Sequence, residues 1–400
     1  MFKKSLIAVS VLMLALAGAA LAGDTNWTFY GVGHVSINSL NNGTDSQLGA
    51  TSNTSRFGFR GTSAIDDNLS AFWQFESLLN AVGKNQNAAT VTSWQPTFDE
   101  HGAVTDWNEV TSQVTVRGVL VGTRNTFVGI KHASAGKFLV GYHDTPFKTL
   151  GRKVEMFPDQ LGDFRAMTFN WDNRLSEIAA WISPDWNGFS MFAAYEFDQG
   201  DPGAPDAKTA MSTMASYATK EFMVGAAYEA LSTGFGPVNG AQVGNGPNAL
   251  RLAGKYTSDQ VDVGLLYQTA TVQKPSEAAF ADLVSTVLGA GATFHANEKW
   301  NVKGAIFISN SDTKAADVAG TADVDESDTK ATMLAFGIDR VFTPSVLCYA
   351  KFGTISNGDM TNVALGGAQS GFGKATSGTL DSQSKLQNPS GISVGTVVTW

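Results

Sequence analysis

Short segments in which apolar residues alternate with small or polar ones recur along almost the whole chain. Within residues 261–270, one face of an extended strand would carry the apolar side chains Val261, Val263, Leu265 and Tyr267. The opposite face would carry small or polar residues, among them Asp262, Gly264 and Gln268. A period of two is typical of a β-strand with one apolar face, and we count about 16 such segments. They begin near Trp27, Thr54, Leu69, Arg124, Gly136, Arg174, Phe189, Thr213, Phe222, Leu250, Val261, Thr286, Lys299, Ala331, Ser345 and Gly391.

Residues 1–22 have a different pattern. Lys3 and Lys4 are followed by an apolar run from Leu6 to Leu16 and by the small-residue site at 20–22. These are the three parts of a secretory signal peptide, and we expect cleavage after Ala22. The alternative is an uncleaved N-terminal anchor. No later apolar run reaches the length of a membrane helix, so residues 23–400 are expected to form a single β-domain.

Composition excludes some classes of protein. The net charge is −9, and removing residues 1–22 takes away two lysines and no acids, which makes it −11. An acidic balance argues against a nucleic-acid partner. The one cysteine, Cys348, cannot form an internal disulfide and is interpreted as a small residue filling a strand position.

Periodicity alone fits both a soluble sandwich and a membrane barrel, but aromatic placement favours the barrel. Many strands carry aromatics near an end, as in the interface girdles of membrane barrels. They are Trp27, Phe29, Tyr30, Phe72, Trp73, Trp181, Trp186, Trp300, Tyr349 and Trp400. On the last strand, the apolar face that we expect to meet lipid consists of Ile392, Val394, Val398 and Trp400. Tight turns, such as residues 64–68, also alternate with long polar loops, such as residues 82–121.

Five segments resemble, in order, parts of the general trimeric porins of Gram-negative bacteria. They are residues 55–61 with 69–76, then 123–129, 136–142 and 394–400. The resemblance implies an all-β fold, a 16-stranded antiparallel transmembrane β-barrel with an inward-folded third loop. It also implies an outer-membrane channel for passive diffusion of small hydrophilic solutes and ions, a homotrimer, and no cofactor. The expected partners are outer-membrane lipid, lipopolysaccharide, and the barrel assembly machinery that would bind the strand ending in Trp400.

The resemblance further implies a constriction with basic residues on the barrel wall and acidic residues on the third loop. If Phe57 and Phe59 face lipid, Arg56 and Arg60 face the lumen. We also expect Phe127 to face outward, which places Arg124 on the inner face, and Arg174 to occupy the matching place on the sixth strand. A midplane arginine on the lipid face costs about 2–4 kcal/mol, so these arginines belong to the lumen or to an interface.

On the loop, residues 155–163 resemble the acidic tip of the family, and Glu155 and Asp159 occupy the expected constriction positions. Facing rows of opposite charge would create a transverse field. The alternative is a solvated surface loop with ordinary carboxylates. Val32, where many relatives have lysine, and the loop cations Lys148, Arg152 and Lys153 leave ion selectivity open; Trp400 stands where phenylalanine is usual.

Other function classes have less support. The five histidines lack the spacing of a metalloprotease, hydrolase or metal-site motif, so we expect no enzyme and no metal site. The acidic stretch at 317–328 lacks the spacing and glycine of a calcium loop. A substrate-selective porin and a non-channel exported β-rich binding protein are the alternatives to a general porin.

Overall fold

A computed structural model describes residues 25–43, 45–82, 87–98, 104–116, 120–168, 171–197, 209–232, 247–272, 283–313, 330–358, 363, 365 and 388–400. The expected signal peptide at 1–22 and the acidic stretch at 317–328 lie outside these ranges. No helix in the described ranges is long and apolar enough to cross a membrane.

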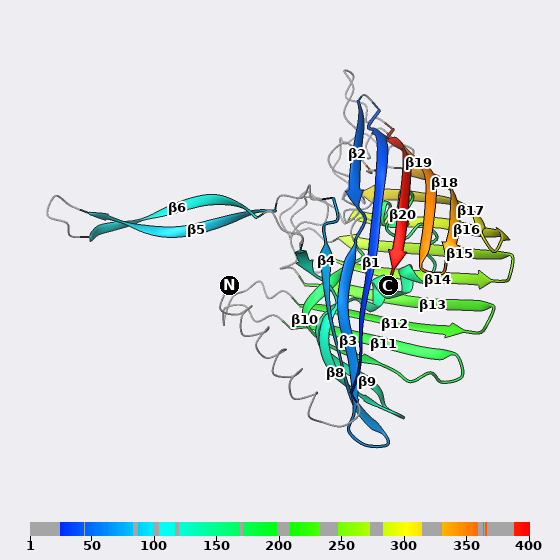
Figure 1. Ribbon diagram of the computed structural model, residues 1–400, viewed down its shortest axis with the longest axis horizontal. Helices are drawn as coiled ribbons and strands as arrows, with labels where there is room; N and C mark the ends of the chain where they lie inside the picture. Colours follow the sequence, from blue (N-terminus) through cyan, green and yellow to red (C-terminus); the bar gives the residue numbers. More distant parts are fainter. Residues whose placement is uncertain are drawn as a thin grey trace, which may run out of the picture.

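Strands dominate the described chain, and eighteen of them form one sheet (Figure 1). These eighteen are β1 (Thr25–Asn41), β2 (Ser46–Ser52), β3 (Arg56–Ala64), β4 (Leu69–Leu79), β7 (Leu120–Thr123), β8 (Thr126–His132), β9 (Gly136–Asp144), β10 (Arg174–Ile182), β11 (Phe189–Glu196), β12 (Ala210–Ala218), β13 (Phe222–Leu231), β14 (Asn248–Thr257), β15 (Val261–Val272), β16 (Leu283–Asn297), β17 (Trp300–Thr313), β18 (Lys330–Thr343), β19 (Val346–Asn357) and β20 (Ser390–Thr399).

The sheet closes because β1 pairs with β20 as well as with β2 and β3. β2 and β3 are consecutive halves of one strand along β1, and β7 and β8 are consecutive halves of one strand along β4. Counting each pair once gives a closed 16-stranded antiparallel barrel, as the sequence predicted. Closure removes the exposed edges that would otherwise pair with other chains.

The long connection expected at 82–121 contains a second, two-stranded sheet. β5 (Asn87–Phe98) pairs antiparallel with β6 (Val104–Val116), and in Figure 1 this hairpin projects sideways from the barrel. The segment is rich in valine and threonine, residues that favour strands. The expectation of a long polar loop at 82–121 is therefore wrong for β5 and β6.

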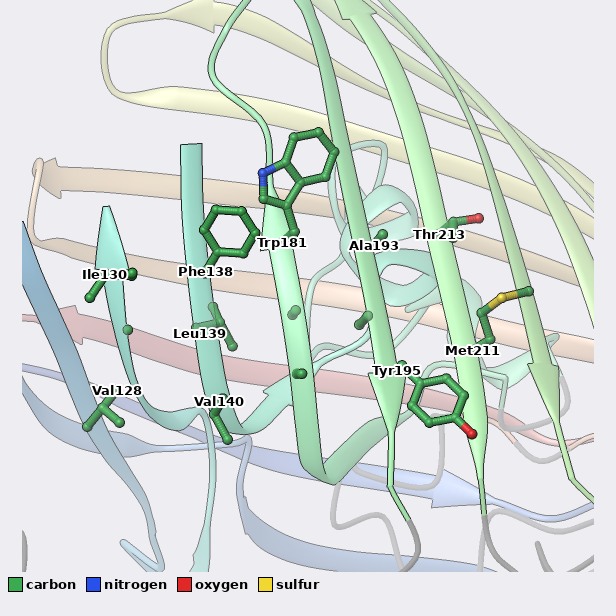
Figure 2. A pocket seen from close by; sticks show the side chains of 14 residues that line it. Val128, Ile130, Phe138, Leu139, Val140, Trp181, Ala193, Tyr195, Met211 and Thr213 are labelled. Carbon is green, nitrogen blue, oxygen red and sulfur yellow. The ribbon is translucent and has the colours of Figure 1, made fainter. Parts of the chain in front are cut away.

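The outer face of the barrel is apolar. The predicted lipid face of the last strand is confirmed, since Ile392, Val394, Val398 and Trp400 are all exposed. Across β8 to β12 this face forms a shallow apolar groove of about 830 Å³, in which Phe138, Trp181, Tyr195 and Met211 surround smaller side chains (Figure 2). An apolar outward face is what a barrel needs in a bilayer.

The predicted outward orientation of Phe127 is wrong. Its neighbours Val128 and Ile130 are 53% and 48% exposed and occupy the outward positions of β8. Phe127 instead faces inward, with its ring centroid 5.8 Å from that of Phe72 and 5.1 Å from that of His143. The apolar ring is therefore packed against other rings inside the barrel. Residues 124–125 interrupt the strand between β7 and β8, so parity along one continuous strand did not apply.

The last residue completes the barrel seam. The backbone N–H of Gly31 donates to the carbonyl of Trp400 at 3.1 Å, and the N–H of Trp400 donates to the carbonyl of Gly31 at 3.2 Å. A Cβ at Gly31 would lie 2.2 Å from the indole ring of Trp400. Only glycine leaves room for the indole at this point.

The third long connection, between β9 and β10, folds into the barrel as the resemblance implied. It contains α2 (Pro146–Arg152) and the short 3-10 helix η1 (Phe164–Ala166). Thr145 caps α2 by accepting the N–H of Lys148, and Pro146 occupies the first turn, where a missing N–H costs nothing. α2 contacts β11 to β14.

This loop forms an apolar core with the inner wall. Seven of its large apolar side chains are at most 1% exposed: Phe147, Leu150, Phe157, Leu161, Phe164, Met167 and Trp171. Fully burying each such side chain contributes roughly 1.5–3 kcal/mol. Gly264 of β15 lets the loop approach closely, because a Cβ there would lie 2.3 Å from the carbonyl oxygen of Val154. One side of the lumen is therefore filled by the loop.

Candidate functional site: the constriction

On the wall opposite the loop, two arginines share one carboxylate. Glu76 of β4 lies between Arg124, whose Nε is 2.6 Å from Oε1, and Arg56 of β3, whose Nε is 3.6 Å from Oε2. The Tyr30 hydroxyl also donates to Glu76 at 3.1 Å. We call Arg56, Glu76 and Arg124 the wall triad. It leaves one positive charge unmatched.

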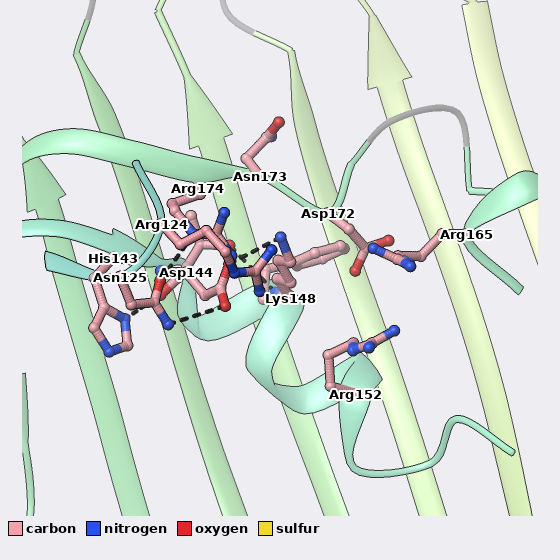
Figure 3. Close-up of polar contacts among 12 residues, drawn as sticks. Arg124, Asn125, His143, Asp144, Lys148, Arg152, Arg165, Asp172, Asn173 and Arg174 are labelled. Carbon is pink, nitrogen blue, oxygen red and sulfur yellow. Dashed lines mark hydrogen bonds and ion pairs between the residues drawn. The ribbon is translucent and has the colours of Figure 1, made fainter. Parts of the chain in front are cut away.

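A second cluster joins the wall to the start of the loop (Figure 3). Asp144, at the end of β9, is 2.8 Å from Arg174 NH2 and 2.8 Å from Lys148 Nζ. The side-chain NH2 of Asn125 donates to the other oxygen of Asp144 at 3.2 Å. The side-chain carbonyl oxygen of Asn125 accepts from Arg174 Nε at 2.8 Å. We call Asp144, Lys148 and Arg174 the Asp144 cluster, and it too leaves one positive charge unmatched. Burial lowers the pKa of Lys148, and the Asp144 carboxylate partly offsets this.

At the loop tip, two carboxylates and two arginines compensate one another. Asp159 lies 3.0 Å from Arg152 NH2 and 2.7 Å from Arg165 NH2, and Asp163 lies 3.3 Å from Arg152 NH1. Asp159 adopts φ 57°, a left-handed conformation that aspartate tolerates, and its N–H donates to Asp163 at 2.8 Å. We call Arg152, Asp159, Asp163 and Arg165 the tip cluster.

The tip cluster faces the wall triad. Burial by itself would raise the pKa of Asp159, but Arg152, Arg165 and then Arg56 hold it well below its usual range. The Thr54 side chain on the wall also lowers it. The carboxylate of Asp159 therefore lies close to Arg56 and Thr54 of the wall.

Glu155 lies in the same loop but is occupied by the loop backbone. Its Oε1 accepts the N–H of Phe157 at 2.7 Å and its Oε2 accepts the N–H of Phe164 at 3.0 Å. Burial, with the nearby Asp163 carboxylate, raises the pKa of Glu155 well above its ordinary value, against the lowering effect of Arg152. The side chain therefore holds the backbone of the loop in shape.

Arg60 lies apart from the other predicted residues. It is exposed, and its guanidinium carbon is 4.9 Å from the ring centroid of Tyr30, toward the short turn that joins β3 to β4. The six predicted residues thus fall into separate groups. Arg56 and Arg124 belong to the wall triad, and Asp159 belongs to the tip cluster. Arg174 belongs to the Asp144 cluster. Arg60 and Glu155 belong to none of these three groups.

The loop is anchored by a buried ion pair that the sequence did not reveal. Arg251 of β14 is fully buried, and its NH1 and NH2 lie 2.7 and 3.1 Å from the two oxygens of Asp172. Its guanidinium carbon also lies 4.1 Å from the ring centroid of Phe147. Burial by itself would raise the pKa of Asp172, but Arg251 holds it below its ordinary value.

The separation of basic wall and acidic loop is incomplete. Glu76 is an acid on the wall, while Arg152 and Arg165 are bases on the loop. Arg152 is one of the loop cations expected from the sequence, and the same pattern could have suggested Arg165, on the other side of the acidic tip. Glu76 lies in the quoted porin-like segment at 69–76, where its inward parity alone could have identified it. Among the described residues, no group of three or more His, Cys, Asp or Glu side chains is placed to hold a metal ion.

The comparisons with known proteins agree with this architecture. The family model described as Gram-negative porin matches residues 8–360. No curated protein sequence gives a significant match.

Solved structures give the same fold at low sequence identity. The anion-selective porin from Comamonas acidovorans is 15% identical, with a TM-score of 0.68 over 94% of this chain and 100% of that chain. OmpT of Vibrio cholerae, in its trimer form, is 15% identical, with a TM-score of 0.62 over 94% and 99%. OmpF of Salmonella typhi, in complex with daunomycin, is 16% identical, with a TM-score of 0.59 over 94% and 97%. By the family match and this fold, the chain belongs to the Gram-negative porins.

Proposed function

We propose that this porin is an outer-membrane channel for passive diffusion of small hydrophilic solutes and ions that favours anions over cations. The barrel supplies the passage, and the third loop narrows it. Diffusion through such a passage needs no bond to be made or broken, so no catalytic role is assigned to any residue. Selectivity then depends on the charges at the narrow point.

The observation that carries the anion preference is the excess of positive charge at the constriction. The wall triad and the Asp144 cluster each contain two cations and one carboxylate. The tip cluster contributes two of each sign. The constriction is therefore cationic although the whole chain carries a net charge of −9. A low-dielectric wall strengthens such a local field.

The arrangement of opposed charges also supports a transverse field. Arg56 and Arg124 lie on the wall and Asp159 lies on the loop that faces them. We therefore retain these three as constriction residues, with Arg174 as a wall cation. Arg60 contributes outside the narrow point, and Glu155 is assigned to holding the loop in shape.

Assembly is part of the proposal. Residues 1–22 have the pattern of a signal peptide that is cleaved on export, which leaves 23–400 as one barrel domain. A homotrimer is supported by the Vibrio cholerae OmpT structure, which is described as a trimer. The exposed apolar outer face would contact lipid and lipopolysaccharide, and the strand that ends at Trp400 would be recognised by the barrel assembly machinery.

Planar bilayers test the channel and its preference together. Purified protein should give stepwise conductance in groups of three, and replacing chloride by gluconate should lower the conductance more than replacing potassium by tetraethylammonium. Silence over a wide voltage range would refute an open pore. A larger loss of conductance on replacing potassium would refute the anion preference but would still be consistent with an open channel.

A further inference from the structure

A cavity of about 460 Å³ lies on the inner face near the short-turn end of the barrel, away from the loop. Inward-facing side chains of β1, β3, β4, β8 and β9 line it, among them Asn26, Arg60, Phe72, Lys131 and Lys137. Its volume is within the range of small-molecule sites, about 300–1,000 Å³. The proposed diffusion of small solutes does not require a pocket here.

Three cations converge on this cavity without a carboxylate. Arg60, Lys131 and Lys137 are exposed, and no carboxylate within the described ranges forms an ion pair with any of them. Lys131 and Lys137 lie directly opposite one another in the β8–β9 ladder. Like charges at directly opposite positions destabilise a sheet, so an anion bound between them would relieve this repulsion.

Beside polar side chains such as Asn26 and Gln74, the cavity has an aromatic part, which is unusual for the water-facing side of a barrel. Phe72 and Phe127 are half-buried, and the centroids of their rings are 5.8 Å apart. The His143 ring extends this aromatic surface beyond Phe127, with its centroid 5.1 Å from that of the Phe127 ring. Lys137 Nζ lies 6.0 Å from the ring centroid of Phe72, so a cation and an apolar surface border the same space.

We infer that this cavity is a binding subsite for small organic anions with an aromatic body. The carboxylate of the ligand would lie between Arg60, Lys131 and Lys137, and its ring would pack on Phe72 and Phe127. The inference rests on the proposed channel, because the ligand must reach the lumen. It adds a solute class that a charged constriction alone would not select.

Benzoate is a suitable probe, with acetate as the charge without the ring and benzamide as the ring without the charge. NMR saturation transfer from the detergent-solubilised protein should show saturable binding of benzoate and much weaker binding of the other two. In bilayers, benzoate should also reduce the chloride current in a saturable manner.

Charge-removing variants locate the site. Lys131→Gln and Lys137→Gln should each weaken benzoate binding about fivefold, as expected for the loss of one nearby charge. Lys220→Gln is the matched control, because Lys220 is an exposed lysine in the β12–β13 turn outside the cavity. Phe72→Leu should weaken benzoate binding and leave acetate binding unchanged.

The outcomes separate the subsite from the channel. Equal binding of acetate and benzoate, or equal weakening by Lys220→Gln, would overturn the subsite. Normal chloride conductance with no benzoate binding would overturn it and leave the channel standing. Benzoate binding that Lys137→Gln weakens, in a protein that conducts no ions, would support the subsite and refute the channel.

Discussion

Arg124→Gln removes one cation from the wall triad and leaves its backbone position unchanged. Glu76 then keeps Tyr30 as a hydrogen-bond donor and Arg56 at 3.6 Å, but loses its closest cation, at 2.6 Å. Leaving a buried charged group with fewer partners costs about 1–3 kcal/mol of stability. The triad changes from a net positive charge to neutral.

The effect on permeation follows from Coulomb's law. A unit charge about 8 Å from a passing ion in water is worth roughly 0.5 kcal/mol, with opposite signs for chloride and potassium. The chloride-to-potassium permeability ratio should therefore fall about fivefold at low salt. Screening should shrink this change at about 1 M salt, where the Debye length is about 3 Å.

Zero-current potentials measured in KCl gradients at low and high mean salt concentration provide the assay. Arg340→Gln is the matched control, because Arg340 stacks on Trp300 and Phe342, two exposed aromatics of the outer face. An unchanged permeability ratio in Arg124→Gln channels of normal conductance would refute the placement of Arg124 at the constriction. So would an equal change in the control.

Four further substitutions test the loop and the seam. Asp159→Asn removes the tip carboxylate and should raise the chloride-to-potassium permeability ratio, whereas Glu155→Gln should change this ratio less, because the oxygens of Glu155 bind backbone N–H groups of the loop. Because the pKa of Glu155 is raised in the folded state, its contribution to stability is present at low pH and is lost as pH rises through that pKa. The stability of Glu155→Gln relative to the unsubstituted protein, measured by thermal unfolding, should therefore increase with pH. Arg251→Gln breaks the buried ion pair with Asp172 and should lower the stability of the barrel by about 3–5 kcal/mol. The single-channel conductance should become larger and noisier as the loop loosens, and an unaltered conductance would contradict the anchoring role. Gly31→Val should overpack the seam against Trp400 and destabilise the barrel by about 1–3 kcal/mol, and a folded fraction equal to that of the unsubstituted protein on electrophoresis without heating would contradict this.

The barrel could be predicted because strand alternation is a local property. Each spanning strand needs outward apolar residues, and that pattern is readable over ten residues without knowing the neighbours. The predicted starts at Leu69, Gly136 and Arg174 coincide with the starts of β4, β9 and β10. Strand alternation predicted the wrong orientation for Phe127. A break in the strand and an aromatic cluster inside the barrel are not visible in the local sequence pattern.

The constriction was harder to predict because it depends on contacts between distant segments. The sequence identified Asp159 as a loop carboxylate, but its two arginine partners on the same loop determine its charge environment. Glu155 could not be distinguished from it by residue type. Only the folded loop shows that the Glu155 oxygens are taken by backbone N–H groups. The partner of Asp172 lies 79 residues away on β14, beyond any local pattern.

The zero-current potential of the unsubstituted channel in a KCl gradient tests the cationic constriction most directly. The excess positive charge of the wall triad and the Asp144 cluster predicts a potential whose sign shows chloride to be the more permeant ion, with a magnitude that decreases as salt rises. A potential of the opposite sign, with potassium the more permeant ion at low salt, would contradict it.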